Sequence, residues 1–194
     1  MSQTTWILIA VLVLVIAIGI IVGLMLGRRH RSARLQEHFG PEYDRTVGEI
    51  GEQRAAEADL LAREKKRKKL DITELTPEAR QEHAALWHRV QADFVDDPKD
   101  AVGRAERLVT RVMRERGYPI DDFDQRAADI SVDHPDIVEN YRRAHAIYKS
   151  ADISTEDARQ AFVHYRALFD RLLGSHTEAD HVNDQQRSQT HDHA

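Results

Sequence analysis

The chain has 194 residues, no cysteine and a formal net charge of −5 at pH 7. Without cysteine it can form no disulfide, no thiolate metal site and no cysteine nucleophile, which suits a reducing cytoplasm. Its length leaves room for one folded domain beside the terminal segments, and the mild acidic excess of residues 76–173 argues against a nucleic-acid-binding domain, which would usually be basic.

The first predicted element is an apolar run, WILIAVLVLVIAIGIIVGLML, from Trp6 to Leu26. As a helix it would rise roughly 31 Å, close to the ~30 Å thickness of the hydrocarbon core of a bilayer. We therefore expect residues 1–27 to form a single transmembrane anchor. The alternative, a cleaved signal peptide, requires a basic start, a shorter apolar core and a small-residue cleavage site, and the sequence has none of these.

Basic residues follow the apolar run and none precedes it. Because arginine and lysine stay on the cytoplasmic side during insertion, this asymmetry predicts a single-pass protein of the cytoplasmic membrane, with its N-terminus outside and its C-terminal domain in the cytoplasm. The basic juxtamembrane residues are Arg28, Arg29, Arg31 and Arg34.

Glycines recur at every fourth position near the end of the run, at Gly19, Gly23 and Gly27. Small residues at this spacing allow two membrane helices to approach closely, so they predict a face for homodimerisation. The alternative is that glycine is simply common in membrane helices. The expected partners of this segment are the lipid bilayer and a second copy of the chain.

Residues 28–75 are predicted to form a basic juxtamembrane segment followed by a helical stalk. Gly40-Pro41 should end the first helix, because proline cannot continue its hydrogen bonds. From Glu42 to about Leu70 the composition favours helix, but the apolar stripe is thin and is weakened by Gly48 and Gly51. A largely solvated stalk is therefore expected rather than a continuous coiled coil.

The stalk ends in the strongest charge run of the chain. Its functional interpretations are binding of anionic lipid, of nucleic acid or of an acidic partner, and the alternative is a solvated helix end whose cations favour the helix dipole. The run consists of Lys65, Lys66, Arg67, Lys68 and Lys69.

Residues 76–174 predict a small all-α bundle of about five helices. Thr76-Pro77 and Asp97-Pro98 each supply an N-cap followed by proline at the first helical position, and Gly117 and Gly174 are placed to end helices. Apolar residues recur at helical spacing and nowhere alternate as in a strand. The expected helices are Thr76 to about Phe94, Pro98 to Arg116, a short helix from Asp121, one from about Pro135 to Lys149, and one opened by Ser154 and Asp157 and closed by Gly174.

The sequence contains no recognisable catalytic or cofactor signature. It lacks a glycine-rich phosphate loop, a nucleophile elbow and the Glu-x-x-His motif of di-iron bundles, so we predict no enzyme activity, no cofactor and no metal site. Residues 175–194 are polar and predicted to be disordered. Their histidines, at spacings that match no established metal site, are His176, His181, His191 and His193.

Parts of the chain resemble a bacterial family of single-span proteins that are generally labelled only as membrane or secreted proteins. The resemblance covers roughly residues 34–173 and is carried by RLQEHFGPEYDRTV, FVDDPKDAV, LVTRVMRERGYPIDDFDQRAADISVDHPDIVENYRRAHAIY and DARQAFVHYRALFDRLL. It implies a bacterial source and the order anchor, stalk, bundle, but no established activity, so no functional residues are carried over. The most specific stretch suggests a candidate interaction surface of Tyr118, Asp122, Asp124, Arg126 and Asp129.

Taken together, these features predict a membrane-anchored helical module for protein interaction or scaffolding. The alternative is a membrane-proximal binder of anionic lipid or nucleic acid that acts through the basic clusters. A third hypothesis, an enzyme with an unrecognised site, would require a polar pocket with converging histidine and aspartate side chains.

Overall fold

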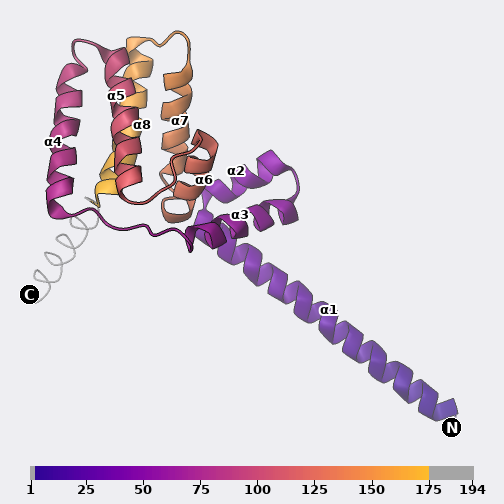
Figure 1. Ribbon diagram of the computed structural model, residues 1–194. Coiled ribbons are helices and arrows are strands. Elements are labelled where there is room, and N and C mark those ends of the chain that lie inside the picture. Colours follow the sequence, from indigo (N-terminus) through magenta and orange to yellow (C-terminus); the bar gives the residue numbers. More distant parts are fainter. Residues whose placement is uncertain (1–2, 175–194) are drawn as a thin grey trace, which may run out of the picture. The chain divides into compact units, whose positions relative to one another are not determined.

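The computed structural model describes residues 3–174 and is helical throughout, with no strand in this part of the chain (Figure 1). The all-α prediction is therefore confirmed for these residues. The chain divides into two compact units, Met1–Leu60 and Leu61–Ala194, and the division falls within α3. The helices are α1 (Gln3–Phe39), α2 (Pro41–Ile50), α3 (Gln53–Arg67), α4 (Pro77–Asp93), α5 (Pro98–Glu115), α6 (Phe123–Asp133), α7 (Val138–Lys149) and α8 (Thr155–Leu173).

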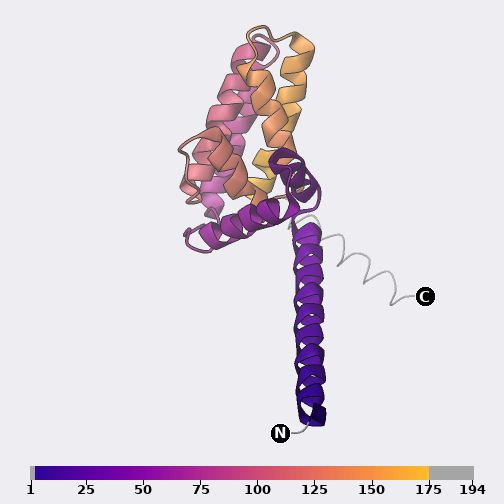
Figure 2. The same ribbon diagram turned by 90° about the vertical axis from the view of Figure 1, so that its right-hand side faces the viewer.

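The prediction of a transmembrane anchor over residues 1–27 is corrected by the structure. Figure 2 shows α1 as one uninterrupted helix, and charged residues follow the apolar run in the same helix. Among the described residues, no helix combines the length and the apolar character that crossing a bilayer requires.

The single-pass placement in a bacterial cytoplasmic membrane, with the N-terminus outside, depended on that anchor and is corrected with it. Gly19, Gly23 and Gly27 lie along α1, and a Cβ atom at any of them would meet nothing within 4 Å. Because the proposed dimer face presupposes a membrane helix, we do not carry it forward.

The segment predicted as one stalk helix forms two helices. Gly40 (φ 48°) separates α1 from α2, Pro41 occupies the first turn of α2, and Gly51 ends α2 in the left-handed conformation at φ 78°. The Tyr43 hydroxyl donates to Glu57 at 2.9 Å and accepts from Gln53 at 3.0 Å, which joins α2 to α3. The segment is thus folded back on itself instead of forming one continuous solvated helix.

The five helices predicted for the C-terminal bundle are all present as α4 to α8. Thr76, Asp97 and Asp122 each accept a hydrogen bond from the backbone N–H three residues later, which caps α4, α5 and α6. Ser154 and Asp157 form the expected capping box at the start of α8. The fourth helix begins at Val138 rather than near Pro135, because residues 135–137 form a turn.

In the bundle, α8 packs against α5 and α7, and α4 packs against α5 (Figures 1 and 2). Aromatic rings also join α4 to α8. The Trp87 ring stacks on Phe169 at a centroid distance of 4.6 Å and lies 4.9 Å from Phe162. Trp87 is almost fully buried, so its indole fills the space between α4 and α8.

The chain enters α4 through an extended segment, residues 71–76, that crosses the end of α5. The Thr73 N–H donates to the Arg116 carbonyl at 2.9 Å, and Leu75 is buried in the core. Gly117 has φ 95°, and a Cβ atom there would lie 2.3 Å from the Asp71 carbonyl oxygen. Glycine is therefore required at this crossing for both its backbone conformation and its lack of a side chain.

Candidate functional site

The C-terminal unit has a cleft of about 440 Å³ at the end of the bundle where α5 and α8 terminate and α4 begins. We call it the basal cleft. An antiparallel arrangement brings these ends together, because α4 runs away from this end while α5 and α8 return to it (Figure 1). The cleft is lined by Glu74, Leu75, Arg80, Arg116, Asp133, His134, Arg171, Leu172, Leu173 and Gly174.

Arg116 is one of the three arginines that line the basal cleft. Its Nε donates to the Thr73 carbonyl at 3.1 Å and its Nη1 to the Leu172 carbonyl at 3.0 Å. Within the described residues it has no carboxylate partner, so both of its hydrogen bonds are to neutral groups. The remaining N–H groups of this guanidinium are the natural donors for an anion.

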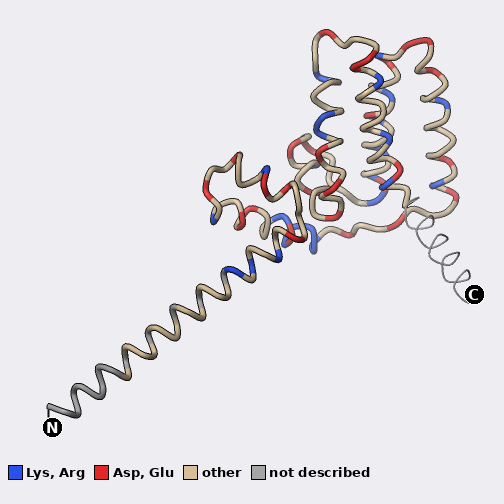
Figure 3. Tube along the Cα trace, turned by 180° about the vertical axis from the view of Figure 1, so that it is seen from behind, with Lys and Arg blue, Asp and Glu red and all other residues tan. Residues whose placement is uncertain are grey.

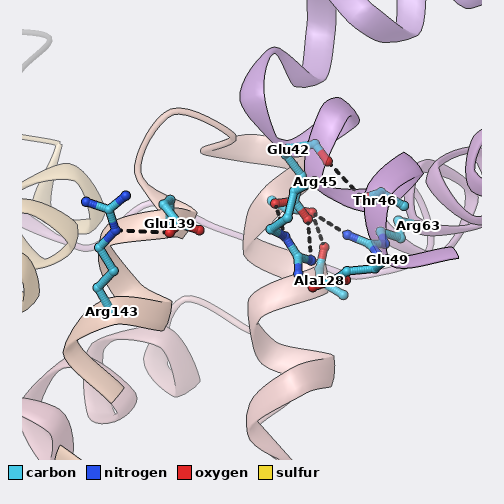
Figure 4. A network of polar contacts seen from close by, with 9 residues as sticks. Glu42, Arg45, Thr46, Glu49, Arg63, Ala128, Glu139 and Arg143 are labelled. Atoms are coloured by element: carbon cyan, nitrogen blue, oxygen red, sulfur yellow. Dashed lines mark hydrogen bonds and ion pairs between the residues drawn. The ribbon is translucent and has the colours of Figure 1, made fainter. Parts of the chain in front are cut away.

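Many other arginines of the described chain form ion pairs with carboxylates, which Arg116 does not. Arg143 pairs with Glu139 one turn away on α7 at 3.0 Å, and Arg45 pairs with Glu42 and Glu49 on α2 (Figure 4). Lysine and arginine alternate with acidic residues over the helices of the bundle (Figure 3). The exposed pairs among these, such as Arg143 with Glu139, contribute little to stability but leave the surface locally neutral.

Two buried polar atoms in residues that line the cleft have no hydrogen-bond partner: Nε2 of His134 and Nε of Arg171. Burial, and then the nearby guanidinium groups of Arg116 and Arg171, lowers the pKa of His134 to about 4 against the opposite effect of Asp133. His134 is therefore neutral at physiological pH. Neither atom is exposed to solvent, and Arg171 pairs with Asp136 through its Nη2 atom.

Both carboxylates of the cleft are already paired. Glu74 contacts Arg80 at 3.3 Å. Asp133 Oδ2 accepts a hydrogen bond of 2.6 Å from the Tyr118 hydroxyl and one of 2.5 Å from Arg67 Nε. The cleft therefore contains two carboxylates that are paired with cations, the guanidinium of Arg116 that has no carboxylate partner among the described residues, and leucine side chains in its lining.

The last turns of α3, which include part of the basic run, are attached to α6 by three contacts, which we call the α3–α6 clasp. Arg63 donates to Ser131 at 3.3 Å, Lys66 to Asp129 at 2.8 Å and Arg67 to Asp133 at 2.5 Å. Lys65, Lys68 and Lys69 are exposed. Two of the five cations of the run, Lys66 and Arg67, are therefore paired with carboxylates of α6, and the other three are exposed to solvent.

The candidate interaction surface around α6 is not one surface in the structure. Tyr118 and Asp129 are buried, with 3% and 1% of their area exposed. Asp122 caps α6, and Arg126 faces Glu106 at 3.7 Å with little exposure. Only Asp122 and Asp124 of the five residues are exposed, so most of this set holds α6 in place.

A second group of buried polar side chains crosses the middle of the bundle between α5, α6, α7 and α8. Thr110 donates to Glu106 at 3.1 Å and accepts from Arg126 at 3.3 Å. Burial raises the pKa of Tyr141 to about 12. The Tyr141 hydroxyl has no hydrogen-bond partner among the described residues. This polar core cluster comprises Glu106, Thr110, Arg126, Tyr141, His145 and Tyr165, of which Arg126 Nε, Tyr141 Oη, His145 Nδ1 and Tyr165 Oη are buried without partners.

The ring of His145 stacks on Phe123 at a centroid distance of 3.6 Å, and burial lowers its pKa. Among the described residues, no group of three histidine or acidic side chains could hold a metal ion. The polar core cluster joins α5 to α6 through the contacts of Thr110 and Glu106 with Arg126.

The remaining predicted residues lie elsewhere. Arg29, Arg31 and Arg34 are exposed on α1, and the side chain of Arg28 and the histidines of residues 175–194 lie outside the part of the chain that the structure describes. Sequence reasoning missed Arg80, Arg116, His134 and Arg171. The available signal was position: three of these four are next to a helix end, and an antiparallel bundle gathers alternate ends on one side.

Comparisons with models of protein families, with curated proteins and with solved structures found no match for this chain.

Proposed function

We propose that the C-terminal unit is a helical protein-interaction module that binds an acidic segment of a partner protein in the basal cleft. The observation that carries the proposal is Arg116, a guanidinium without a carboxylate partner among the described residues, in the lining of a cleft whose two acidic residues are paired with cations. A carboxylate is the planar anion that a guanidinium binds best.

The leucine wall determines the kind of acidic segment that would fit. Leu75 and Leu172 are buried with 5% and 2% of their area exposed, and both line the cleft beside Arg116. A ligand site usually combines an apolar lining with a few polar groups that fix orientation. A segment that alternates acidic and aliphatic residues combines carboxylates for Arg116 with apolar side chains for the leucine lining.

Arg116 donates to one carbonyl near the end of α8, Leu172, and to one in the approach to α4, Thr73. A guanidinium has five N–H groups, so donors of Arg116 remain for the carboxylates of a peptide.

The test is fluorescence anisotropy with two labelled hexapeptides, one of alternating leucine and glutamate and one of alternating leucine and glutamine. The full chain should bind the glutamate peptide saturably and the glutamine peptide at least about tenfold more weakly, because only the former offers carboxylates. Arg116→Gln should remove this preference. Arg114→Gln, an exposed arginine on the same helix outside the cleft, should retain it. Equal affinity for both peptides, or an unaffected Arg116→Gln variant, would refute the proposal.

A further inference from the structure

We propose that Arg67, which does not line the basal cleft, determines its preference for acidic ligands by neutralising Asp133. This inference rests on the proposed function of the cleft. Arg67 Nε lies 2.5 Å from Asp133 Oδ2, and Asp133 is one of the two carboxylates that line the cleft. A residue of the basic run thus influences which ligands the cleft binds, although it does not line the cleft.

The contact between Arg67 and Asp133 affects the charge of the basal cleft. Asp133 lies in the same cleft as Arg116 and Arg171, and without a cationic partner its carboxylate would repel an acidic ligand. The Tyr118 hydroxyl donates to the same oxygen at 2.6 Å, but a neutral phenol leaves the charge of Asp133 in place. Arg67 is the group that supplies the compensating positive charge.

The position of Arg67 is fixed by its neighbours. Arg63 and Lys66 contact Ser131 and Asp129 on α6, so the last turns of α3 lie against α6 at three points. The side chains of Arg67 and Asp133 are 26% and 25% exposed, so water weakens their attraction without removing it. The contacts of Arg63 and Lys66 with α6 therefore help to hold Arg67 beside Asp133.

The basic run offers a matched control. Lys69 belongs to the same run and carries the same charge, but it is exposed and makes no side-chain contact with α6 in the described structure. A general effect of positive charge on an acidic ligand would be reduced similarly by Arg67→Gln and Lys69→Gln. A specific effect through Asp133 would appear only with Arg67→Gln.

The experiment measures the affinity of the leucine–glutamate hexapeptide for four variants of the full chain. Arg67→Gln should weaken binding about three- to tenfold, whereas Lys69→Gln should change it by less than about twofold. Asp133→Asn should bind at least as tightly as the wild type. In the double variant Arg67→Gln/Asp133→Asn the loss should disappear, because no carboxylate remains to be neutralised.

The outcomes separate this inference from the proposed function. If the wild type shows no preference for the glutamate peptide, the proposed function fails and the role of Arg67 fails with it. If the preference is present but Arg67→Gln and Lys69→Gln behave alike, only the role of Arg67 is refuted. Should Arg67→Gln fail to fold, as judged by circular dichroism, Asp133→Asn decides: weaker binding by that variant than by the wild type would overturn the inference.

Discussion

At the scale of single residues, His134 shows how burial can set the charge of a site. Its Nε2 atom has no partner, and burial together with neighbouring guanidinium groups lowers its pKa to about 4. The ordinary pKa of histidine, about 6.5, applies in the unfolded chain. Between these two values the unfolded chain binds the additional proton, so protonation favours unfolding as the pH falls.

This difference predicts an acid-sensitive stability. When the pH is lowered from 7.5 to 5, His134 should reduce the free energy of unfolding of the wild type by about 2 kcal/mol. The same change of pH should reduce the free energy of unfolding of His134→Gln by about 2 kcal/mol less than it reduces that of the wild type. Urea unfolding at both pH values, followed by circular dichroism, measures the difference. His88→Gln, an exposed histidine on α4, serves as the control and should keep the full pH dependence. Identical pH dependence of wild type and His134→Gln would contradict the prediction.

At the scale of elements, α6 depends on the clasp as well as on its own cap. Asp129 is 1% exposed and accepts hydrogen bonds from Lys66 at 2.8 Å and Gln125 at 3.1 Å. A buried carboxylate that loses its cation keeps the cost of leaving water without the compensating attraction. Lys66 therefore stabilises the unit more than an ordinary surface lysine does.

We expect Lys66→Gln to lower the free energy of unfolding by about 2 kcal/mol, because Asp129 would keep only neutral partners. Lys65→Gln, the exposed neighbour, should change it by no more than about 0.5 kcal/mol. Urea denaturation of both variants at one pH provides the comparison. A loss of the same size in the two variants would mean that the Asp129 contact adds nothing.

The elements also show what sequence can and cannot reveal. Caps and prolines located α4, α5 and α8 because their signals are local: Thr76-Pro77, Asp97-Pro98 and Ser154 with Asp157 act within one turn. The clasp and the basal cleft were not found because they join residues far apart in sequence. No local pattern distinguishes Arg67, which meets Asp133, from Lys69, which does not. The membrane anchor was inferred from the length of the apolar run and the basic residues after it, and it is corrected by the finding that no helix among the described residues is long and apolar enough to cross a membrane.

At the scale of the whole bundle, aromatic rings join α4 to α8. Trp87 lies against Phe162 and Phe169 on α8, and Phe94 also contacts Phe162 at 5.1 Å. The start of α4 contributes Arg80 to the basal cleft. The aromatic contacts therefore hold one wall of the proposed binding site in position.

Trp87→Ala should destabilise the chain by about 3–5 kcal/mol, since it removes a large, almost fully buried ring. Trp87→Phe should cost much less, because the Trp87 Nε1 atom has no hydrogen-bond partner to lose. Chemical denaturation followed by far-ultraviolet circular dichroism compares the two. If phenylalanine proved as damaging as alanine, the indole N–H would have to make a contact that this packing does not contain.

The crossing at Gly117 restricts how the chain can vary. The Asp71 carbonyl approaches so closely that a single added carbon at position 117 would collide with it. Two stretches of sequence, the approach to α4 and the exit from α5, are thereby tied together through the smallest residue. Neither stretch can be lengthened, shortened or shifted in register by itself, so related sequences that keep this bundle should preserve the spacing on both sides of the crossing as one unit.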